Sequence, residues 1–146
     1  VVIAGEREAL ERAMAVAKAE GAKRVLPLAV SVACHTPLMG GAAERLAAAL
    51  EATTFYRPWA PVMSNALAAP VEDPAAIKAA LMRQLTAPVR WVESVQAMVA
   101  GGVRTMLEVG PQAVVSGLVR RIDRGIALHA VTDRASLEAL DAGVLG

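Results

Sequence analysis

The stretch LAVSVACHTPLMGGAAERLAAAL, residues 28–50, joins an apolar run to a helical pattern. Its Val- and Ala-rich beginning is typical of a buried strand. Thr36 is a residue type that caps helices and Pro37 is favoured at the first helical position, so the pattern predicts a helix over 37–51. His35 therefore lies at a predicted strand-to-helix corner, and in α/β proteins ligands bind at such corners.

Strand and helix patterns alternate along the rest of the chain. Apolar residues at helical spacing predict further helices over 6–20, 74–85, 91–100, 115–122 and 133–140. Strands are predicted over 1–4, 62–65, 103–109 and 127–131, and Pro27 divides the extended run before His35 into pieces at 23–28 and 29–33. This alternation predicts an α/β protein, and Met106 makes both faces of its strand partly apolar, as a covered parallel sheet requires.

The composition excludes several classes of function. The 146 residues suffice for one ordinary domain, and 15 basic residues are scattered against 14 acidic ones. That balance, with only 3% aromatic residues, argues against a nucleic-acid partner. No apolar run reaches membrane-spanning length, so no membrane association is expected, and no secretory signal is recognisable. The single cysteine excludes a disulfide framework and fits a reducing cytoplasm. Because the chain starts without Met in a strand-like run, we expect it to be a piece of a longer protein.

His35 is the first candidate for chemistry. The positive end of the following helix disfavours a charged imidazolium, and a neutral ring can accept a proton. These features suggest a general base. The alternative interpretation, a histidine beside a helix cap without a catalytic task, is open on these residues alone.

No nucleophile for this base is recognisable in the chain. None of the five serines lies in the G-x-S-x-G pattern of a nucleophile elbow (Ser31, Ser64, Ser94, Ser116 and Ser136). Cys34 adjoins His35, but neighbours on an extended chain point to opposite faces, so a Cys–His pair is disfavoured. His129 is expected to be structural, and two distant histidines do not support a metal site.

Four separated segments carry a family resemblance. They are VVIAGEREALERA (1–13), GAKRVLPLAVSVACHTPLM (21–39), RQLTAPVRWVESV (83–95) and LEVGPQAVVSGLVRRI (107–122). In this order they resemble the C-terminal part of the malonyl-CoA:acyl-carrier-protein transacylases, the acyltransferases of bacterial fatty-acid synthesis that are also embedded in polyketide synthases. The resemblance covers essentially the whole chain.

The resemblance implies an architecture. Members of the family have an α/β-hydrolase-like core with a mainly parallel sheet and an inserted ferredoxin-like subdomain. Residues 1–29 resemble the second half of the insert, and residues 30–146 resemble the C-terminal part of the core.

The resemblance also implies an activity. A serine on a nucleophile elbow takes the malonyl group from coenzyme A, and the phosphopantetheine thiol of acyl carrier protein then attacks the acyl-enzyme. His35 matches the catalytic histidine, and Gln84 matches the residue whose backbone carbonyl orients it. The coenzyme A thioester is a substrate, and no cofactor is implied. The elbow, the oxyanion hole and the arginine for the malonyl carboxylate belong upstream, so residues 1–146 alone are expected to be inactive.

Two further expectations concern partner and substrate. Lys23 and Arg24 precede the His35 corner and are a candidate docking site for acidic acyl carrier protein, although an ordinary solvated pair is equally compatible. Cys34 stands where the family usually has Ser or Phe, which leaves open a polyketide synthase acyltransferase domain with another acyl preference. A non-catalytic interaction module of the same fold is the other alternative.

Overall fold

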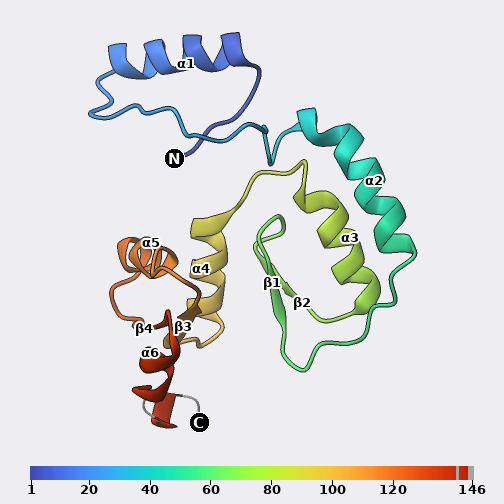
Figure 1. The fold of residues 1–146 in the computed structure, drawn as a ribbon, viewed down its shortest axis with the longest axis vertical. Coiled ribbons are helices and arrows are strands. Elements are labelled where there is room, and N and C mark those ends of the chain that lie inside the picture. The colour runs from blue at the N-terminus through green and yellow to red at the C-terminus, as the bar shows by residue number, and fades with distance from the viewer. Residues whose placement is uncertain (141, 145–146) are drawn as a thin grey trace. The chain divides into compact units, whose positions relative to one another are not determined.

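The computed structural model describes residues 1–140 and 142–144. The chain forms two compact units, Val1–Val89 and Arg90–Gly146 (Figure 1). The boundary predicted after residue 29 concerns the subdomains of related proteins and stays a prediction.

The first helix of unit 1 follows its local sequence pattern. Helix α1 spans Arg7–Ala19, and the residues on its partly buried face are the predicted ones (Leu10, Ala13, Met14 and Ala17). Gly21 ends it at φ 87°, a left-handed conformation that suits glycine, and its N–H donates to the carbonyl of Lys18 at 3.1 Å. The prediction of this helix is therefore confirmed.

A helix pair and a short hairpin form the rest of unit 1. The 3₁₀ turn η1 (Pro37–Met39) leads into α2 (Gly40–Glu51), which packs beside α3 (Pro74–Gln84) (Figure 1). Asp73 caps α3 by accepting the N–H of Ala76 at 2.9 Å, as its sequence predicts. Strand β1 (Val62–Ser64) pairs antiparallel with β2 (Ala69–Val71), and β1 contacts α3.

Unit 2 contains the parallel sheet. Strands β3 (Thr105–Val109) and β4 (Ala127–Val131) pair in parallel over their full length. The helices of the unit are α4 (Trp91–Ala100), α5 (Val115–Ile122) and α6 (Arg134–Glu138), with a short 3₁₀ turn η2 at Ala142–Val144. A buried cluster of Val95, Val119 and Ile126 forms its core. A parallel pair joined by a helix is the α/β arrangement that the sequence predicts.

Three predictions of extended structure are corrected. Residues 1–4 and 23–33 form no strand, and several of their apolar side chains, such as those of Ile3, Val30 and Val32, are more than half exposed. A strand needs a neighbour for its backbone hydrogen bonds, and none of the described strands pairs with these segments. Conversely, β2 was not predicted, because Pro70 lies within it and proline is uncommon in strands. Among the described residues, no helix is long and apolar enough to cross a membrane.

Candidate active site

His35 has an unusual backbone conformation. Its φ is 63°, in the left-handed region that costs most non-glycine residues energy but that His adopts more readily than branched residues. The residue lies in a turn rather than at the end of a strand, which corrects the predicted strand-to-helix corner. Strained residues of this kind persist where surrounding contacts fix them, and they cluster at functional sites.

The C-terminal end of α3 supplies the contacts that fix His35. The backbone N–H of His35 donates to the carbonyl oxygen of Leu85 at 3.0 Å, and its ring Nδ1 lies 3.0 Å from the carbonyl oxygen of Gln84. The last carbonyls of a helix have no partner within that helix. His35 therefore occupies two acceptors that α3 leaves open, and these bonds hold both its backbone and its ring.

Thr36 fixes the other side of the turn. Its hydroxyl donates to the carbonyl of Ala33 at 2.7 Å and accepts the N–H of Leu38 at 3.3 Å, so it caps η1 as predicted. Pro37 takes the first position of η1, also as predicted. The turn is thus closed on both sides of His35 by local bonds and by α3.

The Gln84 contact assigns the tautomer of the ring. A carbonyl oxygen can only accept, so Nδ1 carries the hydrogen and a neutral ring has its lone pair on Nε2. No hydrogen bond to Nε2 forms within residues 1–140 and 142–144. This nitrogen is therefore free to take a proton from another group.

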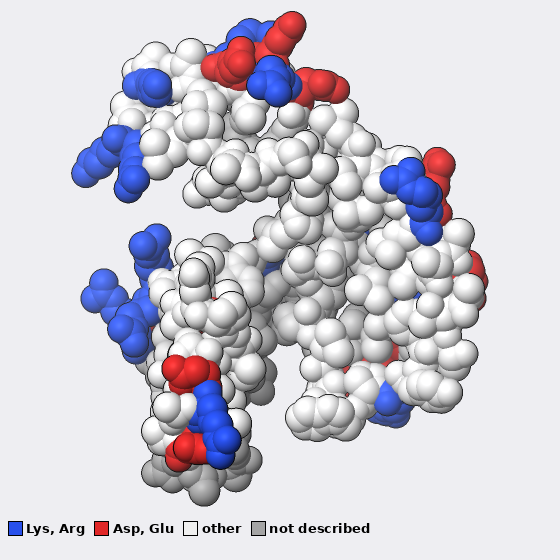
Figure 2. Space-filling model, in the orientation of Figure 1, with Lys and Arg blue, Asp and Glu red and all other residues white. Residues whose placement is uncertain are grey.

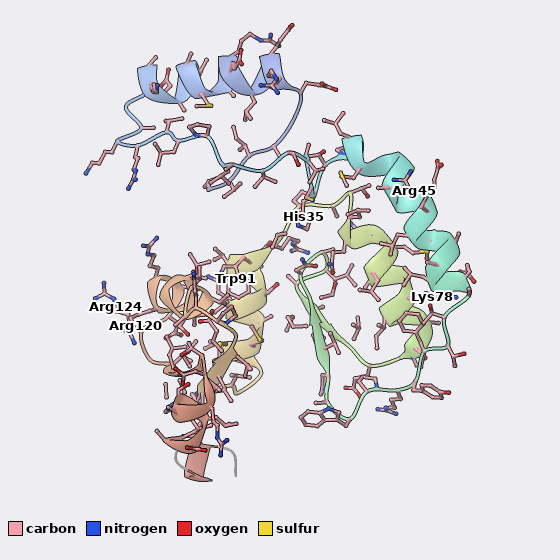
Figure 3. The ribbon with its side chains drawn as sticks, in the orientation of Figure 1. His35, Arg45, Lys78, Trp91, Arg120 and Arg124 are labelled. Atoms are coloured by element: carbon pink, nitrogen blue, oxygen red, sulfur yellow. The ribbon has the colours of Figure 1, made fainter. Side chains whose placement is uncertain are left out.

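A pocket of about 370 Å³ contains this histidine. Its lining comes from the turn and from α2, α3 and the residue after α3 (Cys34, His35, Leu46, Leu50, Leu81, Gln84 and Leu85). Four leucines make its walls apolar, and His35 and Gln84 are polar residues of its lining. Figure 3 labels His35, whose ring contacts the last residue of α3. Apolar walls with few polar groups are typical of small-molecule sites.

The pocket overturns one argument about Cys34. Cys34 and His35 lie in a turn and line the same pocket, whereas the extended-chain argument puts them on opposite faces. The left-handed conformation of His35 explains the difference, because strict alternation of side chains holds only in extended chains. Cys34 thus contributes a half-buried thiol to the site.

The remaining predicted residues lie outside this pocket. Lys23 and Arg24 are exposed and form no ion pair within the described part of the chain, and their docking role stays a prediction. The Leu85 carbonyl was missed by sequence reasoning, and its only signal is its place after Gln84 at a helix end. Four of the five serines hold structural hydrogen bonds (Ser64, Ser94, Ser116 and Ser136). Among the described residues, no three potential metal ligands are grouped.

Fold and site together define an α/β protein with a histidine in an apolar pocket, whose ring Nδ1 is held by a backbone carbonyl. No family model matches the chain. The malonyl CoA-acyl carrier protein transacylases of Salmonella typhimurium and Bacillus subtilis are 48% and 41% identical to it, over 95% and 94% of the chain. The chain spans 45% and 44% of the length of these two relatives.

Solved structures give the same result. An acyl carrier protein S-malonyltransferase from Vibrio cholerae is 46% identical and has a TM-score of 0.89, with 94% of this chain and 45% of that one covered. A malonyl-transacylase in complex with a type II PKS acyl-carrier protein is 47% identical and has a TM-score of 0.88, with 92% and 44% covered. The chain is thus homologous over nearly its whole length to the malonyl CoA-acyl carrier protein transacylases, and it corresponds to a C-terminal portion of them.

Proposed function

We propose that the protein containing this chain transfers a malonyl group from coenzyme A to the phosphopantetheine thiol of acyl carrier protein, for fatty-acid biosynthesis. The single observation that carries the proposal is the bond between His35 Nδ1 and the Gln84 carbonyl, which leaves Nε2 as a proton acceptor in an apolar pocket. The homology to malonyl CoA-acyl carrier protein transacylases supports the choice of acyl group and carrier.

His35 acts twice in the proposed reaction. As a serine oxygen from outside this chain attacks the malonyl thioester, its proton passes to Nε2, and the same proton then goes to the departing coenzyme A sulfur. In the second half, the carrier thiol gives its proton to Nε2 and attacks the serine ester, and the serine oxygen recovers that proton. Proton and electron counts balance, since each half exchanges one acyl group between two nucleophiles.

The Gln84 carbonyl has a positioning role in this proposal. It keeps the Nδ1 hydrogen in place throughout, because it has no proton of its own to exchange. As a neutral group it also avoids a buried carboxylate in an apolar pocket, which would itself need a partner. Gln84 is therefore a positioning residue, and His35 is the catalytic one.

The proposal also covers the substrates, the carrier and the cellular location of the protein. The reaction uses malonyl-CoA and acyl carrier protein and needs no cofactor, because acyl exchange between thiols involves no oxidation or reduction. The exposed Lys23 and Arg24 remain candidates for docking the carrier. We further propose a cytoplasmic location without nucleic-acid or membrane partners, supported by the near-balanced charge and the single cysteine.

One observation favours a second candidate carrier. The 47% identical transacylase was solved with a type II PKS acyl-carrier protein, so the carrier of a polyketide synthase is the alternative acceptor. Parallel assays with the fatty-acid and the polyketide carriers separate the two, since the true acceptor gives the higher kcat/KM.

The catalytic role of His35 is tested by single-turnover acylation of the whole protein. We expect His35→Asn to slow acyl transfer by roughly 10²–10⁴-fold, the usual contribution of a positioned general base. Asn tolerates a left-handed backbone better than Ala does, so His35→Asn should be more stable than His35→Ala, by about 1 kcal/mol. Thermal melts of both variants provide the folding control. A folded His35→Asn protein that acylates at the parent rate would refute the role.

A further inference from the structure

A tight turn of four residues carries His35. It runs from Ala33 to Thr36, with Cys34 and His35 at its two central positions. His35 has a φ of 63°, and turns that require a positive φ at the second central position usually have Gly or Asn there. A histidine in this conformation persists only where other contacts hold it. The turn therefore depends on the bonds that its neighbours make.

The hydroxyl of Thr36 closes this turn. It donates to the carbonyl oxygen of Ala33, the first residue of the turn, at 2.7 Å, a usual length for a hydroxyl donor. The same oxygen accepts the N–H of Leu38 at 3.3 Å, which is longer than most bonds of that kind, and this contact is exposed. The bond to Ala33 is partly buried, where competition from water is weaker. Turn closure is thus the stronger contact of Thr36, and helix capping is the weaker one.

No charged group of the same segment holds His35. Residues 25–43 contain no Asp, Glu, Lys or Arg, and Figure 2 shows uncharged surface between the charged side chains of α1 and those of α2. Within residues 1–140 and 142–144, His35 forms no ion pair. The position of its ring therefore depends on the Gln84 carbonyl oxygen, 3.0 Å from Nδ1, and on the backbone that carries the ring.

The backbone of His35 and the direction of its ring are linked. A return of φ to the usual negative values would rotate the bond from Cα to Cβ, and it would carry Nδ1 away from the Gln84 carbonyl. The N–H of His35, which donates to the Leu85 carbonyl at 3.0 Å, would also be displaced. The left-handed conformation is thus held by α3 on one side and by the Thr36 hydroxyl on the other. Loss of that hydroxyl removes one of these two supports.

We propose that Thr36 is a positioning residue of the reaction and that its hydroxyl acts by donating to Ala33. This closure keeps His35 in the conformation in which Nδ1 meets the Gln84 carbonyl and Nε2 is left to accept a proton. The proposal rests on the proposed function, in which His35 is the general base. Thr36 itself exchanges no proton with the substrate. Its loss should therefore slow the chemical step and leave the binding of malonyl-CoA unchanged.

Single-turnover acylation of the whole protein tests this role. Thr36→Val removes the hydroxyl and keeps the size and branching of the side chain, whereas Thr36→Ser keeps the hydroxyl. We expect Thr36→Val to lower the acylation rate at saturating malonyl-CoA by about tenfold to a hundredfold, with the half-saturating concentration unchanged, because a displaced base reacts slowly. Thr36→Ser should stay within about threefold of the parent rate. If Thr36→Val does not fold, Thr36→Ala removes the hydroxyl without adding an apolar branch.

Two control variants separate this role from stability. Thr53, just after α2, donates to the Ala49 carbonyl at 2.8 Å, so Thr53→Val loses the same kind of bond outside the pocket. Asp73→Ala loses the cap of α3 at the helix end opposite Gln84, and it thereby matches the loss of the Leu38 contact. Both variants should lower the Tm and leave the acylation rate unchanged.

A second measurement observes the ring without acyl transfer. Nitrogen NMR of isotope-labelled histidine reports which ring nitrogen carries the hydrogen, and His35→Asn assigns the His35 signals. At alkaline pH, where histidine rings are neutral, the parent and Thr36→Ser should carry the hydrogen on Nδ1. Thr36→Val should show a larger fraction with the hydrogen on Nε2, because its ring is no longer held at the Gln84 carbonyl. Thr53→Val should match the parent.

The two measurements together decide the proposal. A folded Thr36→Val protein that acylates at the parent rate would overturn it, as would an unchanged position of the ring hydrogen. Equal losses of rate in Thr36→Val and in the control variants would also overturn it, because stability alone would explain them. A changed ring in Thr36→Val, together with a His35→Asn protein that still acylates at the parent rate, would support the positioning by Thr36 and refute the proposed function.

Discussion

At the scale of single residues, backbone groups of another element hold His35 in its conformation. Its left-handed backbone and its ring are both held by carbonyls at the end of α3. Backbone carbonyls cannot be removed by side-chain substitution. Substitutions at His35, at Thr36, whose hydroxyl closes the turn, or at positions that move the helix end are therefore the ones expected to disturb this geometry.

Substitution of Gln84 tests this backbone argument. Gln84→Ala keeps the carbonyl that accepts from Nδ1, and Ala favours helices, so α3 should persist. We expect the acylation rate to fall by less than about tenfold, well below the loss expected for a missing general base. Single-turnover acylation beside His35→Asn measures the contrast. A Gln84→Ala protein that melts like the parent but is as slow as His35→Asn would show that the amide side chain of Gln84, and not its carbonyl, supports the reaction.

Sequence reasoning reached part of this site. The residue type and the Thr-Pro cap singled out His35, and the resemblance singled out Gln84. The left-handed conformation and the Leu85 bond could not be predicted, because they arise between residues about fifty positions apart (49 for the Gln84 contact). The shared pocket of Cys34 and His35 depends on the same tertiary contact.

At the scale of elements, α5 is capped by a strand residue rather than by its own sequence. Its N-cap residue, Val114, has no side chain that can accept a hydrogen bond. Glu108 of β3 instead accepts the N–H groups of Val115 at 2.8 Å and of Ser116 at 2.7 Å. The carboxylate also lies at the positive end of the helix, where negative charge is favourable. These two hydrogen bonds couple β3 directly to α5, the helix that follows it.

The Glu108 cap should make stability depend on pH. The hydrogen bond from the Ser116 hydroxyl, and then those from the Ser116 and Val115 N–H groups, lower the pKa of Glu108. A carboxyl whose pKa is lower in the folded state stabilises fully above its unfolded pKa, and this contribution is lost as pH falls through the folded pKa. Glu108→Gln should therefore lower the Tm at pH 7, and the difference from the parent should shrink below about pH 4. Melts across this pH range check it; a constant difference would mean that the charge is irrelevant.

The packing of α4 gives a second prediction at this scale. Val95 is fully buried in the core of unit 2, whereas Val92 on the same helix is 51% exposed. Val95→Ala removes buried methyl groups and leaves a small cavity, so we expect a loss of about 2 kcal/mol in the free energy of unfolding. Val92→Ala is the matched control and should change it by less than about 0.5 kcal/mol. Urea denaturation of both variants measures this, and equal losses would contradict the proposed core.

At the scale of the whole molecule, residues 1–146 contain the proposed base, His35, and the Gln84 carbonyl beside it, and none of their serines lies in a G-x-S-x-G elbow. The four serines with structural hydrogen bonds cap or brace local structure. The chain aligns with less than half the length of its relatives. The histidine is thus expected to need a nucleophile from elsewhere.

The lack of a serine in a nucleophile elbow predicts how the 146-residue chain behaves when it is tested alone. Incubated with labelled malonyl-CoA, it should form no stoichiometric ester on serine, because none of its serines lies in an elbow. Intact mass spectrometry detects such an adduct directly, and circular dichroism shows whether the chain is folded. A stoichiometric malonyl adduct on any serine would contradict the prediction.

The sequence by itself determined the helices and their order, because caps and apolar periodicity are local. It fixed α1 with its Gly21 end, the Asp73 and Thr36 caps, and the α/β alternation. Only the tertiary structure decided which segments pair as strands, since a ladder needs a partner that local sequence does not name. It also decided the left-handed turn at His35 and the Glu108 cap, because both are made by groups that only folding brings together.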